Sequence, residues 1–127
     1  MKIEILKNDD VYLRLHKDVF GTDNVKIPEV VYAAKTDDGV IFGFISGNWN
    51  FDGSFYMEFA GILTEFRKKG YLRYLNNMLL PNVSYITVTH NDNVVAQKTL
   101  LSMGFRVIGC RYDGQFYVEW ARRVKNG

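Results

Sequence analysis

The sequence predicts a mixed α/β fold (α+β, mixed sheet), in which helices pack on one sheet. Short apolar runs typical of strands alternate along the chain with segments whose apolar residues recur every three or four positions, as in helices. Asp-Gly pairs stand between neighbouring strand-like runs, which is typical of β-hairpins. The chain has 127 residues, 47% of them hydrophobic, which suffices for the core of one domain, and we expect residues 1–127 to form it.

The first half of the chain predicts one helix and four strands. Gly21 is placed to end the helix, and Asp37-Asp38-Gly39 form a tight turn because Asp-Gly supplies the positive φ that the turn requires. The predicted elements are a strand at Lys2–Lys7, a helix at Val11–Phe20, and strands at Val30–Thr36, Val40–Ser46 and Ser54–Leu63.

The second half predicts two helices and three strands, which gives the order β-α-β-β-β-α-β-α-β-β. After Gly70 the apolar residues follow the spacing of an amphipathic helix, which Pro81 ends. Asn91 or Asp92 can cap the next helix, and Gly104 is placed to close it. The predicted elements are a helix from about Gly70, a strand at Val83–Thr89, a helix at Asn93–Met103, and strands at Phe105–Arg111 and Gln115–Arg122.

Composition and simple motifs exclude several classes of function. A net charge of +2 does not demand a polyanionic partner, and the single cysteine, Cys110, excludes an intrachain disulfide. The charged stretch MKIEILKNDD contains neither a signal-peptide core nor a membrane span, so we expect a cytoplasmic protein without a membrane partner. Two histidines and one cysteine without metal-ligand spacing predict no metal site. Phosphate-loop and nucleophile-elbow motifs are both missing.

The segment Phe66–Leu75, FRKKGYLRYL, joins a predicted strand to a predicted helix. A helix that begins there has backbone N–H groups without intrahelical partners, and these groups attract anions together with the positive end of the helix dipole. Gly70 lets a phosphate approach the main chain, and Arg67, Lys68 and Lys69 add positive charge. Taken alone, the same residues are more typical of a solvated basic helix start.

Two stretches carry markers that occur together in one known superfamily. In FAGILTEFRKKGYLRYL, Arg67 and Gly70 match the segment (Gln/Arg)-x-x-Gly-x-(Gly/Ala) between a strand and a helix. In NVVAQKTLLSMGF, the residues that match Asn-x-x-Ala, a helix and Gly-Phe are Asn93, Ala96, Gly104 and Phe105. The chain thus resembles the GNAT acetyltransferases, also in its order of elements. The resemblance implies a GNAT-like fold that binds acetyl-CoA as co-substrate where the fourth and fifth strands splay apart.

The resemblance also implies a role for each matching position. Main-chain groups of Ala60, Gly61 and Ile62 would contact the pantetheine arm, and the small side chains at 60 and 61 would leave room for it. Asn93 would hydrogen-bond an amide of the arm, although by itself it is an ordinary helix-start residue. Backbone N–H groups would cradle the pyrophosphate, and the cofactor contacts implied in this loop are Arg67, Lys68, Lys69, Gly70, Tyr71, Leu72 and Arg73.

Acetyl transfer to an amine needs a group that takes a proton from the ammonium. Glu58, in the apolar run FYMEFAG, is the first candidate, because burial raises the pKa of a carboxyl group. An exposed or cross-strand-paired glutamate is the other interpretation of the same residue. His90 is the second candidate for the catalytic base, and a surface or capping histidine is its alternative.

The chain departs from the superfamily pattern at two leucines. Leu72 stands where the loop usually has a second small residue, which would weaken or shift pyrophosphate binding. Leu100 stands seven residues after Asn93, where many members have a tyrosine that protonates the leaving CoA thiolate. The proton would then have to come from another group, such as Tyr112, Tyr117 or water.

We therefore expect an acetyl-CoA-dependent N-acetyltransferase that acts on a primary amine of a small molecule, peptide or protein. One alternative is a GNAT-like protein that binds CoA, has lost catalysis and serves as an interaction module. A second is an RNA-binding module, because KKGYLRYL resembles the Lys/Arg-Gly-Tyr strand of an RRM. The helical spacing after Gly70 counts against RNA, so we expect no nucleic-acid partner. The acceptor and the oligomeric state stay open, with a homodimer as one option.

Overall fold

The computed structural model describes residues 1–124, whose strands form a seven-stranded sheet in the order β1-β2-β3-β4-β5-β7-β6. The pair β4 and β5 is parallel, whereas β1–β2, β2–β3, β5–β7 and β6–β7 are antiparallel, so the predicted mixed α/β class is confirmed. The elements are β1 (Lys2–Ile5), α1 (Asp9–Phe20), β2 (Val30–Lys35), β3 (Ile41–Trp49), β4 (Phe55–Ile62), the 3-10 turn η1 (Thr64–Phe66), α2 (Leu72–Met78), β5 (Tyr85–His90), α3 (Val94–Ser102), β6 (Arg106–Tyr112) and β7 (Phe116–Arg122).

The chain forms two compact units, and β4 contributes to both of them. The first unit contains Met1–Asn48 and Glu58–Leu79, and the second contains Trp49–Met57 and Leu80–Gly127. That all of them form one domain stays a prediction. No helix within residues 1–124 is long and apolar enough to cross a membrane.

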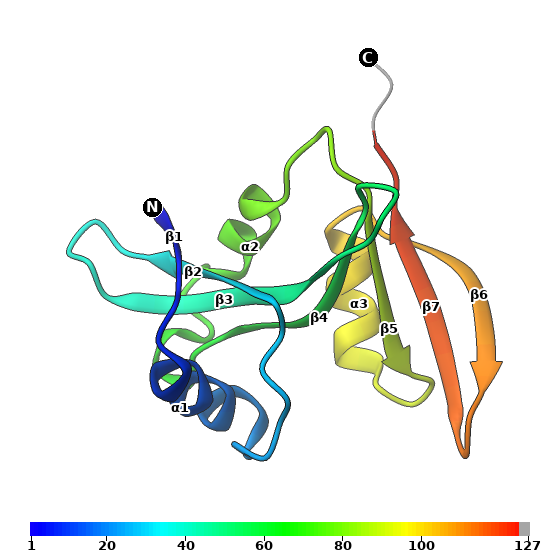
Figure 1. Ribbon diagram of the computed structural model, residues 1–127, viewed down its shortest axis with the longest axis horizontal. Coiled ribbons are helices and arrows are strands. Elements are labelled where there is room, and N and C mark those ends of the chain that lie inside the picture. The colour runs from blue at the N-terminus through cyan, green and yellow to red at the C-terminus, as the bar shows by residue number, and fades with distance from the viewer. Residues whose placement is uncertain (125–127) are drawn as a thin grey trace. The chain divides into compact units, whose positions relative to one another are not determined.

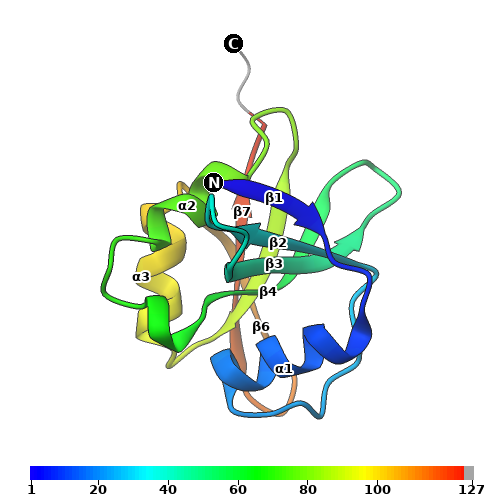
Figure 2. The same ribbon diagram turned by 90° about the vertical axis from the view of Figure 1, so that its left-hand side faces the viewer.

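In the first unit, α1 and α2 lie on opposite faces of β2 and β3 (Figures 1 and 2). Helix α1 begins two residues before the predicted start, because Asn8 caps it by accepting a hydrogen bond from the N–H of Val11. It ends at the predicted Gly21, which has φ 79°. The core on the α1 side is formed by the buried side chains of Tyr12, Val31 and Phe44.

Helix α2 is shorter than the sequence predicts. It begins at Leu72, two residues after the expected start, and ends at Met78, before Pro81. Tyr71, which we assigned to the helix, precedes it and packs its ring on Phe42 of β3, with ring centroids 4.7 Å apart. The apolar spacing after Gly70 therefore reflects packing of the end of the loop as well as of the helix.

In the second unit, β5 pairs with β7 along its whole length but with β4 only at Phe55–Tyr85 and Tyr56–Ile86. Figure 1 shows β5, β7 and β6 in this order. The predicted cap of α3 is wrong, because Asn93 rather than Asn91 or Asp92 accepts the hydrogen bond from Ala96 N–H. The boundary differs because the chain turns once more before the helix begins.

Two glycines of the first unit allow close packing. Gly43 lets β3 approach β4, and Gly61 lets β4 approach α1. A Cβ added to Gly43 would lie 2.8 Å from the carbonyl oxygen of Gly61. A Cβ added to Gly61 would lie 2.4 Å from Cγ1 of Val19. The packing of α1 thus requires a glycine at position 61. The resemblance gave a different reason for a small residue there, namely room for the pantetheine arm.

We expect Gly61→Ala to lower the free energy of unfolding by about 1–3 kcal/mol, because the added methyl overlaps Val19. Val19→Ala removes the obstructing methyls, so the double variant should lose less than the sum of the two single variants. Urea unfolding measures all three. Gly109→Ala is the control, since its Cβ would meet only the flexible carboxylate of Glu119 at 3.3 Å. Additive losses would contradict this explanation.

Candidate cofactor and active site

The loop between β4 and α2 presents a row of backbone N–H groups. Lys68 has φ 61° and Gly70 has φ 80°, so two left-handed residues alternate with residues of ordinary conformation. Within residues 1–124, no hydrogen bond uses the N–H of Lys68, Lys69, Gly70 or Tyr71. Successive free N–H groups in a turn that contains left-handed residues form a concave anion site. The loop therefore fits a phosphate or pyrophosphate group.

The side chain of Arg67, a residue of this loop, fixes the loop by two hydrogen bonds. Its Nε donates to the carbonyl of Ile62 at 3.0 Å, and one terminal nitrogen donates to the carbonyl of Val19 at 3.2 Å. The guanidinium thereby joins the end of β4 and the last turn of α1 to the loop. Arg67 is one of the predicted cofactor contacts, but two of its five N–H donors are already used in these bonds.

A second contact fixes the start of the same loop. Asp18 of α1 accepts hydrogen bonds from the amide of Thr64 at 2.8 Å and from its hydroxyl at 2.6 Å. These bonds lower the pKa of Asp18, mainly through the Thr64 hydroxyl and then its amide, with a smaller contribution from the positive charge of Arg67. Helix α1 thus positions both ends of the segment Thr64–Arg67.

The remaining loop residues divide into half-buried and exposed groups. Phe66 and Tyr71 pack on each other with ring centroids 5.2 Å apart, which anchors the loop to the first unit. The side chains of Lys68, Lys69 and Leu72 are exposed. Because KKGYLRYL lies on a loop and a helix, the RNA-binding alternative lacks the strand that it requires.

Glu58 is exposed, so the expectation of a buried carboxyl group is wrong. Its Oε2 accepts a hydrogen bond from Nδ2 of Asn48 at 3.2 Å, and Oδ1 of Asn48 accepts another from the N–H of Glu29 at 2.9 Å. The other interpretation, an exposed or cross-strand-paired glutamate, agrees with the structure, because Glu58 is exposed and hydrogen-bonded to Asn48 of the neighbouring strand β3. Its use as a catalytic base stays a prediction.

The second unit brings two predicted residues together. Nδ1 of His90 lies 2.9 Å from Oε1 of Gln115, and Nε2 of Gln115 donates to the hydroxyl of Tyr117 at 2.7 Å. The rings of His90 and Tyr117 have centroids 5.0 Å apart. His90 is exposed, and Gln115 links its ring to the hydroxyl of Tyr117 in one chain of hydrogen bonds.

The markers on α3 have structural roles. Oδ1 of Asn93 caps the helix, so only its amide nitrogen is left to donate to a ligand. Leu100 is 5% exposed and belongs to the core of its unit. A leucine at this position therefore stabilises the fold and carries no proton. Tyr112, the other candidate acid, is 67% exposed.

Sequence patterns missed three residues that shape the first unit. Asp18 and Asn48 act through partners 46 and 10 positions away, and only the tertiary fold brings them together. His16, to which the sequence assigns no role, is 2% exposed, and its Nδ1 lies 2.7 Å from the carbonyl of Thr22. Within residues 1–124, no group of three or more His, Cys, Asp or Glu side chains could hold a metal ion.

Comparison with known proteins identifies the fold. No family profile and no curated protein sequence matches the chain. Among solved structures, a spermidine N-acetyltransferase chimera from Vibrio cholerae SpeG and hSSAT has a TM-score of 0.74 at 14% identity, over 95% of this chain and 94% of that one. A GNAT-family acetyltransferase from Bacillus cereus has 0.71 at 20%, over 98% of both chains. The protein thus has the GNAT fold, as its motifs predicted.

A further structure with this fold carries a cofactor. It is a streptothricin acetyltransferase from Bacillus anthracis, described as putative and in complex with acetyl coenzyme A. Its TM-score is 0.54 at 20% identity, over 77% of this chain and 63% of that one. At such identities the likeness concerns the fold, so the chemistry of this chain has to be argued from its own residues.

We expect Asp18→Asn to destabilise the protein by about 0.5–1 kcal/mol at pH 7, since the carboxylate is exposed and solvent screens it. The pKa of Asp18 is lowered on folding, so its contribution is fully present above the ordinary value of 3.8 and is lost as pH falls through the lower folded value. Urea unfolding at pH 7 and pH 2.5 should show the difference between variant and parent shrinking in acid. Asp10→Asn, on the same helix, is the control, and a difference that is independent of pH would contradict this role.

Proposed function

We propose that the protein is an acetyl-CoA-dependent N-acetyltransferase that moves an acetyl group to a primary amine of a small molecule, peptide or protein. The observation that carries this proposal is the row of free N–H groups from Lys68 to Tyr71. The GNAT fold, and the acetyl coenzyme A bound in one structure that shares it, support the choice of cofactor.

The loop would hold the cofactor mainly through its main chain. Helix α2 has only seven residues and its first residue has no side-chain cap, so the free N–H groups before it would supply the donors. Lys68, Lys69 and Arg73 are exposed and would add charge that solvent screens. The main-chain groups of Ala60, Gly61 and Ile62 on β4 would hold the pantetheine arm, and the amide nitrogen of Asn93 would donate to it.

Acetyl-CoA would supply an acetyl thioester, and the protein would orient it and move protons. The amine nitrogen forms the new C–N bond to the acetyl carbon, the C–S bond breaks, and CoA leaves as a thiolate. Glu58 would take the proton that the amine loses, with Asn48 holding its carboxylate in place. His90 is the second candidate for this role. Since Leu100 has no proton to give, the thiolate would be protonated by Tyr117, Tyr112 or water.

One observation favours the alternative of a CoA-binding module without catalysis. Leu100 is buried in the core at the position where, by the resemblance, many GNAT enzymes have the tyrosine that protonates the thiolate. The enzyme and the non-catalytic module would share the cofactor site and differ in turnover. Independent measurements of CoA binding and of acetyl transfer therefore distinguish the two hypotheses.

We expect Gly70→Ala to raise the dissociation constant for CoA about tenfold, because a left-handed alanine costs about 1–2 kcal/mol and the loop would relax away from its binding shape. Lys69→Ala should raise it less than about fivefold, since it removes one screened charge. Isothermal titration calorimetry with CoA and acetyl-CoA measures both.

Gly39→Ala is a matched control for strain. Gly39 has φ 85° in the β2–β3 turn, and its Cβ, like that of Gly70, would meet nothing within 4 Å. This variant should lose similar stability and keep its CoA affinity. A parent protein that binds neither CoA species would end the proposal, and a larger loss in Lys69→Ala than in Gly70→Ala would overturn the main-chain mode.

We expect Glu58→Gln to lower kcat for acetyl transfer at least about 100-fold while the dissociation constant for CoA stays unchanged, because the amide cannot accept the proton. Thiol release measured with a panel of primary amines at saturating acetyl-CoA gives kcat. Glu65→Gln, an exposed glutamate on η1, should retain activity. Full activity of Glu58→Gln would direct the search to His90, and a parent that binds CoA without any transfer would favour the non-catalytic alternative.

A further inference from the structure

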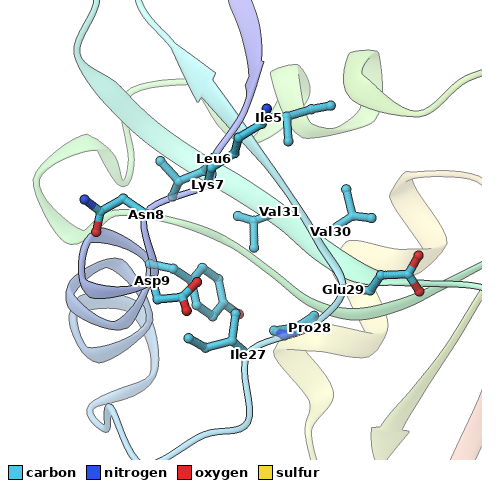
Figure 3. A pocket seen from close by; sticks show the side chains of 11 residues that line it. Ile5, Leu6, Lys7, Asn8, Asp9, Ile27, Pro28, Glu29, Val30 and Val31 are labelled. Atoms are coloured by element: carbon cyan, nitrogen blue, oxygen red, sulfur yellow. The ribbon is translucent and has the colours of Figure 1, made fainter.

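The first unit contains a cavity that the proposed cofactor contacts do not use. It has a volume of about 300 Å³ and lies between the start of α1 and the segment that leads into β2 (Figure 3). That volume is at the lower end of the range of small-molecule sites. Much of its lining is apolar, with side chains from Leu6, Ile27, Pro28, Val30 and Val31.

The charged groups at the cavity favour a cation. Asp9 and Glu29 line it from opposite sides, and Lys7 lines it as well, which leaves one negative charge in excess (Figure 3). Within residues 1–124, neither carboxylate takes part in an ion pair. Asn8 also lines the cavity, but its side-chain oxygen is used to cap α1. A space lined partly by apolar side chains and partly by polar groups, beside carboxylates without an ion pair, suits a molecule with a hydrocarbon part and an ammonium group.

Two lining residues connect the cavity to Glu58. The N–H of Glu29 donates to Asn48, whose Nδ2 in turn donates to Glu58. On the other side, Tyr12 lines the cavity, and its hydroxyl lies 2.9 Å from Oγ of Ser46. Burial raises the pKa of Tyr12, the hydrogen bond with Ser46 partly offsets this rise, and the negative charge of Glu58 adds a smaller rise.

We propose that this cavity binds the hydrocarbon part of a primary alkyl- or arylalkylammonium compound, and that this compound is the acetyl acceptor. The cavity site itself follows from its lining, whereas the role as acceptor rests on the function proposed above. With the hydrocarbon in the cavity, the nitrogen would lie toward Glu58, which takes its proton as the C–N bond forms.

Titration of the ¹⁵N-labelled protein with hexylamine, without CoA, tests the site directly. We expect hexylamine to shift the amide resonances of residues 8–12 and 27–31. The neutral 1-hexanol should bind about two- to fivefold more weakly, because it lacks the charge that the exposed carboxylates attract. Hexanoate should not bind. Absence of shifts in both segments at millimolar hexylamine, or equal binding of all three compounds, would overturn the proposal.

Three variants sharpen this test. Asp9→Asn should weaken hexylamine about two- to fivefold, whereas Asp10→Asn, the next residue on the same helix turn and not part of the lining, should leave affinity unchanged. Ile27→Phe should weaken both hexylamine and hexanol about tenfold by filling the space, with its fold checked by thermal unfolding. Equal effects of Asp9→Asn and Asp10→Asn would contradict a role of the lining charge.

The proposed amine site and the proposed enzyme activity can be rejected independently of each other. Hexylamine that binds in the cavity without becoming acetylated would keep the site and end its role as acceptor site. Acetyl transfer to amines that is unaffected in a folded Ile27→Phe variant would keep the proposed enzyme and reject the cavity as its acceptor site.

Discussion

The shape of the loop after β4 depends on hydrogen bonds from outside its own backbone. The carbonyl of Val19 lies in the last turn of α1, where it has no intrahelical partner, and Arg67 satisfies it together with the carbonyl of Ile62. Asp18 in turn binds both donors of Thr64. Because side chains hold the loop, its own N–H groups from Lys68 to Tyr71 need no internal partners. A ligand can therefore use these groups without breaking a bond that the fold requires.

This arrangement gives the basic residues of the loop different roles. Arg67 has the most specific role. Its planar guanidinium donates to two backbone segments, and a lysine would be a poor substitute for it. The charges of Lys68 and Lys69 are exposed, so they act on a ligand at long range and through solvent. Lys68 also has a left-handed conformation, which is costly for a residue with a side chain and contributes to the concave row of donors.

Local signals in the sequence were sufficient to predict the class of fold. The site was harder to predict, because its residues make contacts with partners far away in the sequence. The turns at Gly21 and Gly39 follow from backbone chemistry that the sequence displays directly. Glu58 was expected to be buried because its neighbours are apolar, but side chains alternate along a strand, and Glu58 is exposed between buried Met57 and half-buried Phe59. The partners of Asp18 and Arg67 lie up to 48 positions away, so no local pattern indicates them. The resemblance explained the small residue at Gly61 by room for the pantetheine arm, which stays a prediction; the contact with Val19 lies 42 positions away and no local pattern indicates it.

In the proposed reaction, the leucine at position 100 would matter less than the removal of a proton from the acceptor amine. A thiol like that of cysteine has a pKa of about 8.5, so a leaving thiolate takes a proton from water readily near neutral pH. An alkylammonium like that of lysine has a pKa of about 10.4, and at pH 7 its deprotonation costs about 4.6 kcal/mol, whereas an α-amino group near 7.8 costs only about 1 kcal/mol. The chemical demand therefore falls on the base, and it is largest for an acceptor with an alkyl amine. In the proposed reaction Glu58, whose carboxylate accepts a hydrogen bond from Asn48, would have to meet that demand.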